Sequence, residues 1–309
     1  SSSSSSGGGG SSGDSVVSLA GTTPTGLPRP PPVQPVVRTH LPPVESYGGD
    51  KTKGIHGAYH VIANQNTRYK SYMEDAYVCV PQWRPGASFF GVYDGHSGRG
   101  AADYCVQHLH DHVKMAVDSG MSMSDAFDAA FKATDQDLGI LDIKKPGTTA
   151  AVAVLTRAGY GGIKKRMVHV ANVGDARVIL CENKKAIRLT YDHKASDDAE
   201  QKRIEALGGV FLWGKVQGQL AVTRAIGDHD LKKFVIAEPH VRGYELGNAK
   251  QHPFLLIACD GIFDVLSDQE CVDFLLSCPS KAEVMATRLI DHVLAKTSKD
   301  NCTAMVVLL

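Results

Sequence analysis

Strand-like segments that follow one another without a helix between them constrain the fold of this chain most strongly. The runs "TTAAVAVL", "RMVHVANVGDARVILC" and the C-terminal "TAMVVLL" are rich in Val, Ile and Ala, and "ASFFGVYDGH" and "PFLLIACDGIFDVL" are apolar runs that end in acidic turns. The β-branched residues among them favour strands, whereas a doubly wound parallel sheet would need helices between successive strands. We therefore predict an α+β fold with largely antiparallel sheets.

Other segments carry the signals of helices. Residues 98–117 and 124–137 have helical patterns, and "DDAEQKRIEALGG" combines an acidic first turn with a glycine stop at Gly208. Residues 267–270 (Ser-Asp-Gln-Glu) and 280–283 (Ser-Lys-Ala-Glu) each match a capping box, in which a serine and a glutamate satisfy free backbone N–H groups. We expect helices to begin at both.

Residues 1–50 differ in composition from the rest of the chain. They begin with "SSSSSSGGGGSSG" and continue with "PTGLPRPPPVQP". Such a segment buries too little apolar area to offset its loss of conformational entropy, so we predict disorder over residues 1–50 and one globular domain over residues 51–309. Arg29, Pro32 and Pro35 fit a ligand pattern for Src-homology 3 domains, but proline-rich tracts match it easily and we favour a plain extended linker.

Charge and cysteine usage narrow the class of protein. The formal net charge is +0, which argues against a dedicated nucleic-acid binder. No apolar run approaches the roughly 20 residues of a membrane span. The 7 cysteines are widely spaced and form no C-x-x-C pair, so we expect reduced thiols and a cytoplasmic protein. Nuclear or lipid-anchored forms stay open, because the chain starts with Ser.

Acidic residues recur where the strand-like runs end or begin. Each of the acidic groups adjoins such a run. The groups are Glu74-Asp75, Asp94-Gly95-His96, Asp175, Asp260 with Asp264, and Asp300-Asn301. Several carboxylates gathered at one edge of a sheet would repel each other unless cations lie among them. Taken singly, each group has a plainer interpretation, because Asp-Gly is a common turn and one carboxylate is easily paired on the surface. The recurrence favours a metal site.

The residue types select the kind of metal and the chemistry. Nearly all the candidate ligands are carboxylate oxygens, which suit Mg²⁺ or Mn²⁺ and not structural zinc. Two such ions bridged by a carboxylate are an established arrangement for hydrolysing phosphate esters, since they activate a water and offset phosphoryl charge. The pattern therefore indicates a two-metal phosphoesterase.

The acidic groups and their surroundings together resemble the type 2C protein phosphatases, the metal-dependent serine/threonine phosphatase family. The similar stretches are, in order, "YMEDAY", "FFGVYDGHSG", "GTTAAVAVL", "VANVGDARVIL", "LTYDHKASDDAEQKRIEALGG", "GQLAVTRAIGD", "IACDGIFDVLSDQE" and "SKDNCTAMVV". The resemblance implies a sandwich of two antiparallel β-sheets flanked by helices on both sides. It also implies hydrolysis of phosphoserine and phosphothreonine in proteins by direct attack of water between two Mg²⁺ or Mn²⁺ ions, without a phosphoenzyme.

The resemblance also implies roles for single residues of this sequence. The expected ligands of the two metal ions are Glu74, Asp75, Asp94, the carbonyl of Gly95, Asp260 and Asp300. Asp94 would bridge the ions, and His96 would be the general acid for the leaving oxygen. Asp175 and Asp264, with Asp260, match a weaker third metal site. Thr149, Asp228 and Asn301 match motif positions with supporting roles.

The sequence departs from the family pattern where the substrate phosphate should bind. The family usually has arginine four residues before the metal-binding glutamate, whereas this chain has Lys70 there and Arg68 nearby. Lysine supplies a point charge in place of a bidentate fork. We favour Lys70 as the phosphate ligand, with Arg68 as the alternative.

A second departure is length, because the chain is shorter than many family members between "AIGDHD" and "FLLIACDG". That region and the preceding "FLWGKVQGQL" resemble the flap beside the site. We expect Val210 and Leu212 to pack in the core, and for Trp213 both core packing and a docking surface stay open. Two other functions compete with that of an active protein phosphatase. One is a pseudophosphatase that binds partners, and the other is an esterase for small phosphorylated molecules.

Overall fold

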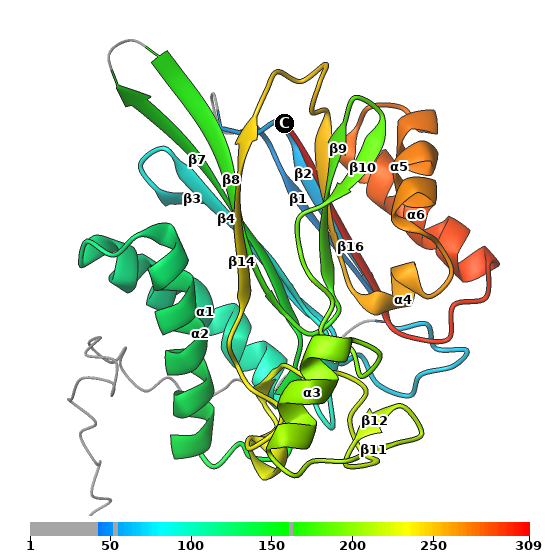
Figure 1. Ribbon diagram of the computed structural model, residues 1–309. Helices are drawn as coiled ribbons and strands as arrows, with labels where there is room; N and C mark the ends of the chain where they lie inside the picture. The colour runs from blue at the N-terminus through cyan, green and yellow to red at the C-terminus, as the bar shows by residue number, and fades with distance from the viewer. Residues whose placement is uncertain (1–42, 52–54, 161–162) are drawn as a thin grey trace, which may run out of the picture.

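The fold is a sandwich of two antiparallel β-sheets with helices on both outer faces, as predicted (Figure 1). The computed structural model describes residues 43–51, 55–160 and 163–309. Helices α1 and α2 cover one sheet, and α5 and α6 cover the other. The predicted α+β class and the four-layer arrangement are therefore confirmed.

The first sheet has six strands in the order β1-β2-β16-β15-β9-β10, and all its pairs are antiparallel. Its strands are β1 (Val44–Gly49), β2 (Tyr59–Asn64), β16 (Cys302–Leu308), β15 (Phe254–Ala258), β9 (Arg177–Glu182) and β10 (Lys185–Arg188). Every residue of β15 is buried, because that strand is central and covered on both faces. This explains its continuous apolar sequence, which shows no alternation.

The second sheet has five strands in the order β14-β8-β7-β4-β3, again antiparallel throughout. They are β14 (His240–Leu246), β8 (Ile163–Val173), β7 (Ala150–Tyr160), β4 (Ala87–Tyr93) and β3 (Ala76–Arg84). The segment "RMVHVANVGDARVILC" supplies β8 to this sheet and β9 to the other. The turn at Gly174, with φ of +80°, therefore connects the two layers.

Three apolar clusters hold the four layers together. One lies between the sheets and includes Phe90, Leu155 and Leu255. The others lie under the helices α1 (Gly100–Asp118) and α2 (Met123–Ile140) on one side, and under α4 (Asp260–Phe263), α5 (Asp268–Ser277) and α6 (Ala282–Ala295) on the other. Burial of these apolar faces is the main stabilising term of such a fold.

Of the two predicted capping boxes, one is present and one is not. Ser267 accepts a hydrogen bond from the Glu270 N–H, and the Glu270 side chain accepts one from the Ser267 N–H, so α5 begins as predicted. Helix α6 instead has Lys281 at its N-cap, without a side-chain cap. The prediction at Ser280 is wrong because α6 begins one residue later, at Ala282, so the Ser-x-x-Glu spacing is out of register.

Strand β1 corrects the N-terminal boundary. Residues 44–49 fall inside the segment predicted to be disordered, yet they pair with β2 from Val44↔Asn64 to Gly49↔Tyr59. Backbone pairing needs no apolar periodicity, and a Cβ at Gly48 would lie 2.2 Å from His60 Nδ1, so only glycine allows this approach. Residues 1–42, with the proposed Src-homology 3 ligand at Arg29, Pro32 and Pro35, lie outside the described residues.

A small module lies at the lower end of the sandwich in Figure 1. It comprises α3 (Asp198–Ala206) and the hairpin β11–β12 (Phe211–Leu212 and Lys215–Val216), around a cluster that includes Ile204 and Val216. The prediction that Val210 and Leu212 pack in the core is wrong, since they are 50% and 47% exposed. In the two-residue strand Phe211 faces the cluster, so its neighbours face solvent. Trp213, in the turn that joins the strands, is 90% exposed.

No helix among the described residues is long and apolar enough to cross a membrane. All 7 cysteines are free: Cys105, Cys181, Cys259, Cys271 and Cys302 are buried, and Cys79 and Cys278 are partly buried. This agrees with the prediction of reduced thiols.

Candidate metal and phosphate site

Four of the predicted metal ligands lie at strand ends that the two sheets bring together. Asp75 immediately precedes β3 and Asp94 immediately follows β4, beside the register pair Ala76↔Tyr93. On the facing sheet, Asp260 begins α4 after β15, and Asp300 precedes β16. Single ligand atoms of Asp75, Asp94 and Cys259 all lie within 4.8 Å of one another. Antiparallel pairing thus places residues distant in sequence at one end of the sandwich.

The carboxyl groups in this cluster interact strongly. Burial, followed by the charge of Asp260 and other nearby carboxylates, raises the pKa of Asp94 well above its usual range. Burial and then the charges of Asp175, Asp264 and Asp300 raise the pKa of Asp260 to about 7. Burial is also the first cause for Asp75, whose pKa rises to about 6. The protein on its own lacks enough positive charge there to keep all these acids ionised.

Asp75 supplies a direct test of whether a cation fits. The Thr303 hydroxyl donates a hydrogen bond of 2.6 Å to Asp75 Oδ2. The other oxygen, Oδ1, is buried and accepts no hydrogen bond from the described residues. A buried carboxylate oxygen without a donor is costly, and a hard divalent cation is the partner that such oxygens prefer. The residues present therefore fit Mg²⁺ or Mn²⁺.

Glu74 and Gly95 are held close together by the backbone. The Gly98 N–H donates to Glu74 Oε1 over 2.7 Å, and the Glu74 N–H donates to Asn301 Oδ1 over 2.9 Å. A Cβ on Gly95 would lie 2.5 Å from the Glu74 carbonyl oxygen, so glycine is required there. Asn301 also donates to the carbonyls of Gln65 and Tyr72, which ties the loop before Glu74 to β16.

Lys70 and Arg68 lie in different surroundings. The Lys70 ammonium forms an ion pair with Asp300, and its side chain is 33% exposed. Burial alone would lower the pKa of Lys70, but the hydrogen bond to Asp300 and the charges of Asp300, Asp94 and Glu74 raise it overall. Arg68 is exposed, and its guanidinium lies over the Tyr69 ring at 5.3 Å from the centroid. Only Lys70 of the two interacts with the acidic cluster in the described contacts.

His96 is oriented by Asp228. The His96 Nε2 lies 2.8 Å from both carboxylate oxygens of Asp228. The small sheet β5 (Gly95–His96), β6 (Gly147–Thr148) and β13 (Ile226–Gly227) brings the two residues together. A Cβ on Gly147 would lie 2.0 Å from Asp228 Oδ2 and 2.4 Å from His96 Nε2, so glycine makes this contact possible.

Thr149 holds the backbone of Asp94 through two hydrogen bonds. The Thr149 N–H donates to the Asp94 carbonyl over 2.8 Å, and the Asp94 N–H donates to Thr149 Oγ1 over 3.3 Å. The predicted third-site acids also lie near this centre, because the charges of Asp175 and Asp264 both raise the pKa of Asp260. Asp175 is 5% exposed, whereas Asp264 is exposed.

Three residues near the site were not singled out from the sequence. Cys259 follows β15 and is fully buried, and burial raises the pKa of its thiol well above the usual value. Thr303 bonds Asp75, and Lys194 forms an ion pair with Asp175. All three residues lie within or next to a motif stretch of the sequence. Only the fold shows that their side chains lie close to carboxylates. Sequence spacing offers no signal for these contacts.

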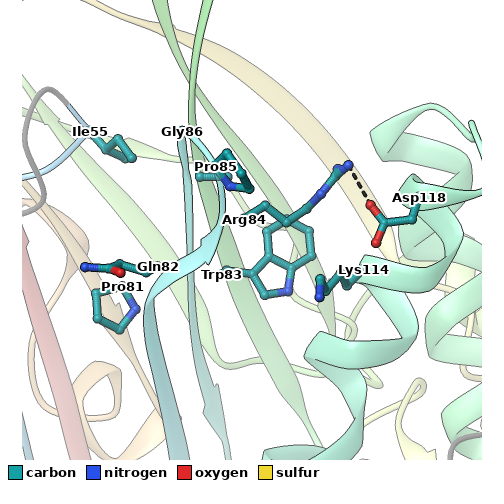
Figure 2. A pocket seen from close by; sticks show the side chains of 10 residues that line it. Ile55, Pro81, Gln82, Trp83, Arg84, Pro85, Gly86, Lys114 and Asp118 are labelled. Carbon is teal, nitrogen blue, oxygen red and sulfur yellow. Dashed lines mark ion pairs between the residues drawn. The ribbon is translucent and has the colours of Figure 1, made fainter.

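A cavity of about 610 Å³ lies elsewhere, at the opposite end of β3 from Asp75 (Figure 2). Its lining includes Trp83, Arg84 and Lys114. Arg84 forms an ion pair with Asp118 at 2.7 Å, so its charge already has a partner. None of the predicted site residues lines this cavity, and the acidic cluster remains the candidate site.

Comparisons with known proteins agree with this geometry. Residues 59–302 match the family model described as protein phosphatase 2C. Protein phosphatase 2C homolog 1 of Schizosaccharomyces pombe is 39% identical over 259 residues, which is 80% of this chain and 72% of that protein. The Saccharomyces cerevisiae protein of the same name is 34% identical over 262 residues, 81% of this chain and 92% of that protein.

Solved structures show the same fold at lower identity. The crystal structure of serine-threonine phosphatase 2C from Toxoplasma gondii has a TM-score of 0.68 and 24% identity, covering 87% of this chain and 99% of that one. A Caenorhabditis elegans sex determining protein has a TM-score of 0.73 and 23% identity, covering 84% of this chain and 66% of that one. From the family match and the close relatives together, this chain belongs to the protein phosphatase 2C family, the metal-dependent serine/threonine protein phosphatases.

Proposed function

We propose that the protein hydrolyses phosphoserine and phosphothreonine in proteins by direct attack of water, with two Mg²⁺ or Mn²⁺ ions and no phosphoenzyme. The observation that carries the proposal is the buried group of carboxyls Asp75, Asp94 and Asp260, each of which has a raised pKa and forms no ion pair with a lysine or arginine of the described residues. Such a group is stable in its ionised form only when positive charge is supplied.

The residues that would hold the ions are Glu74, Asp75, Asp94, the Gly95 carbonyl, Asp260 and Asp300. All of these donors are oxygens, which suit Mg²⁺ or Mn²⁺. When bound, the ions would promote ionisation of a water and offset negative charge on the phosphoryl oxygens. Cys259 is a poor nucleophile, because its buried thiol stays protonated. This supports attack by water over a covalent thiol intermediate.

His96 would protonate the leaving oxygen of the serine or threonine. Asp228 contacts His96 at Nε2, which fixes the orientation of the ring, and in the doubly protonated ring Nδ1–H would be the proton donor. The Asp228 side chain has little room to adopt another position, because it is 7% exposed and the backbone around Gly147 packs against it. The pair would therefore act as a positioned general acid and its orienting carboxylate.

Lys70 would contact the substrate phosphate. Its ammonium is already next to Asp300, so a phosphate entering the site meets a cation whose position is set by a carboxylate. Thr149 and Asn301 would support the site by holding the backbone of Asp94 and of Glu74. The substrates would be phosphoproteins, and the proposed location is the cytoplasm.

The test is release of phosphate from a phosphothreonine peptide by the full chain. We expect turnover with Mn²⁺ or Mg²⁺, loss of turnover with excess EDTA, and recovery when metal is restored. Mass spectrometry of enzyme quenched during turnover should show no phosphorylated protein. A folded protein that is inactive with both metals would contradict the proposal and favour a partner-binding pseudophosphatase. Activity that persists in EDTA would contradict the metal assignment.

A further inference from the structure

Lys194 forms an ion pair with Asp175, one of the three residues predicted to form a third metal site. These three, Asp175, Asp260 and Asp264, are called the outer ligands below. The Lys194 ammonium lies 3.1 Å from Asp175 Oδ2. The Asp175 side chain is 7% exposed, and this is its ion pair among the described residues. A nearly buried carboxylate thus has a protein cation as its partner.

The position of Lys194 is set by the backbone. The His193 N–H donates to the Gly174 carbonyl over 2.9 Å, which holds this segment beside Asp175. On the other side, the Thr223 N–H donates to the His193 carbonyl over 2.9 Å, and Lys194 pairs with Val222 in an isolated β-bridge. Lys194 is therefore fixed at its base from both sides, unlike a lysine on a free surface loop.

The charge of Lys194 acts on all three predicted outer ligands. The Lys194 ammonium forms an ion pair with Asp175, and the charge of Asp260 helps to raise the pKa of Lys194. Burial raises the pKa of Asp264, and the charge of Lys194 lowers it. A further nearby acid, Asp192, raises the pKa of Lys194 more than Asp260 does, but its carboxylate forms its ion pair with the Arg177 guanidinium, 2.6 Å away. The ion pair of Lys194 itself is with Asp175.

We propose that the Lys194 ammonium occupies the outer cation position of Asp175, Asp260 and Asp264, so that a third divalent ion binds there only by displacing it. The inference rests on the proposed function, because it assumes that the inner carboxylates hold two ions. Two like charges at one carboxylate oppose each other, so the lysine and a third ion compete for Asp175. The protein would then need two divalent ions, with its own lysine as the third positive group.

The experiment counts Mn²⁺ bound to the metal-stripped full chain, using electron paramagnetic resonance to measure free Mn²⁺ during titration. The variants are Lys194→Gln and Lys194→Met. Both remove the positive charge, and Lys194→Met keeps a long apolar side chain. The control is Lys165→Gln, which removes an exposed lysine paired with Glu245 and leaves the acidic cluster untouched. Circular dichroism checks that each variant is folded.

We expect two tight Mn²⁺ ions in the wild type and in all three variants, with a weaker third ion. Removing Lys194 should tighten the third ion by roughly two- to fivefold, as expected for losing a competitor whose ion pair is partly exposed. Adding Asp175→Asn to Lys194→Gln should abolish that gain. An unchanged or weaker third ion in both Lys194 variants would overturn the inference, and two tight ions would still support the proposed function. Absence of tight ions in the wild type would overturn both.

Discussion

Replacing Glu200 with glutamine should loosen the module of α3 and β11–β12 while leaving the sandwich intact. The Glu200 side chain is 3% exposed and accepts hydrogen bonds from Arg224 Nη2 at 2.6 Å and Arg203 Nη2 at 2.8 Å. Both arginines also donate to backbone carbonyls of the following segment, Arg203 to Phe234 and Arg224 to Glu238. Glu200 is therefore the buried anion that holds two partly buried cations.

The free energy that the ion pairs of Glu200 contribute to folding follows from its pKa. Burial raises it, but the hydrogen bonds and charges of Arg224 and Arg203 outweigh burial and lower it from 4.5 to about 2. At about 1.4 kcal/mol per pKa unit, this corresponds to roughly 3 kcal/mol. Because the folded-state pKa is depressed, this stabilisation is present above pH 4.5 and is lost as the pH falls toward 2. Breaking a buried ion pair by removing one partner costs a similar amount, about 3 to 5 kcal/mol.

Native-state hydrogen exchange is the appropriate assay, because it separates local from global unfolding. At pH 7 we expect Glu200→Gln to lower the opening free energy of α3 amides by roughly 3 kcal/mol, with little effect on amides of β7 or β16. The matched control is Glu205→Gln, an exposed glutamate of the same helix. The reasoning is refuted if α3 amides exchange alike in both variants, or if the difference persists unchanged below pH 4.

Three further predictions concern the site. Asp94→Asn should lower kcat by roughly 10³-fold, since it removes a ligand worth several kcal/mol of charge stabilisation. Circular dichroism should show that the variant is folded, and wild-type turnover with added metal would refute the assignment. Lys70→Ala should raise KM for a phosphopeptide roughly tenfold, whereas Arg68→Ala should change it little; the reverse result would select Arg68. Gly147→Ala should lower kcat while retaining bound Mn²⁺, because its methyl group would displace His96 and Asp228. Unchanged kcat would show that the pair is not required.

The strands could be predicted well because their composition depends on local burial. The central strands β4 and β15 are buried along their whole length, so their sequences are continuous apolar runs. Strand β1 could not be predicted, because its stability comes from backbone pairing with β2 and from glycine at residues 48 and 49. Edge strands that pair through the backbone leave little trace in hydrophobic periodicity.

Short elements show the same limit. The Ser267 capping box was predictable because the helix starts at the residue that the motif specifies. The Ser280 motif has the same spacing, yet the helix begins elsewhere. At the hairpin of β11 and β12, two-residue strands set which side chains face the cluster, and Phe211 takes the inward position in place of Val210 and Leu212. A phase difference of one residue reverses such a prediction.

Strand composition and the Asp-Gly motifs are local properties, so the fold class, the family resemblance and the acidic candidates could be predicted from the sequence. Which charges meet depends on the three-dimensional arrangement of the chain. It places Lys70 against Asp300, Asp228 against His96, and Lys194 against Asp175. These partners lie between 19 and 230 residues apart in sequence, and antiparallel pairing with loop packing brings them together. Electrostatic interactions act through space, so the fold sets which of these charges are paired.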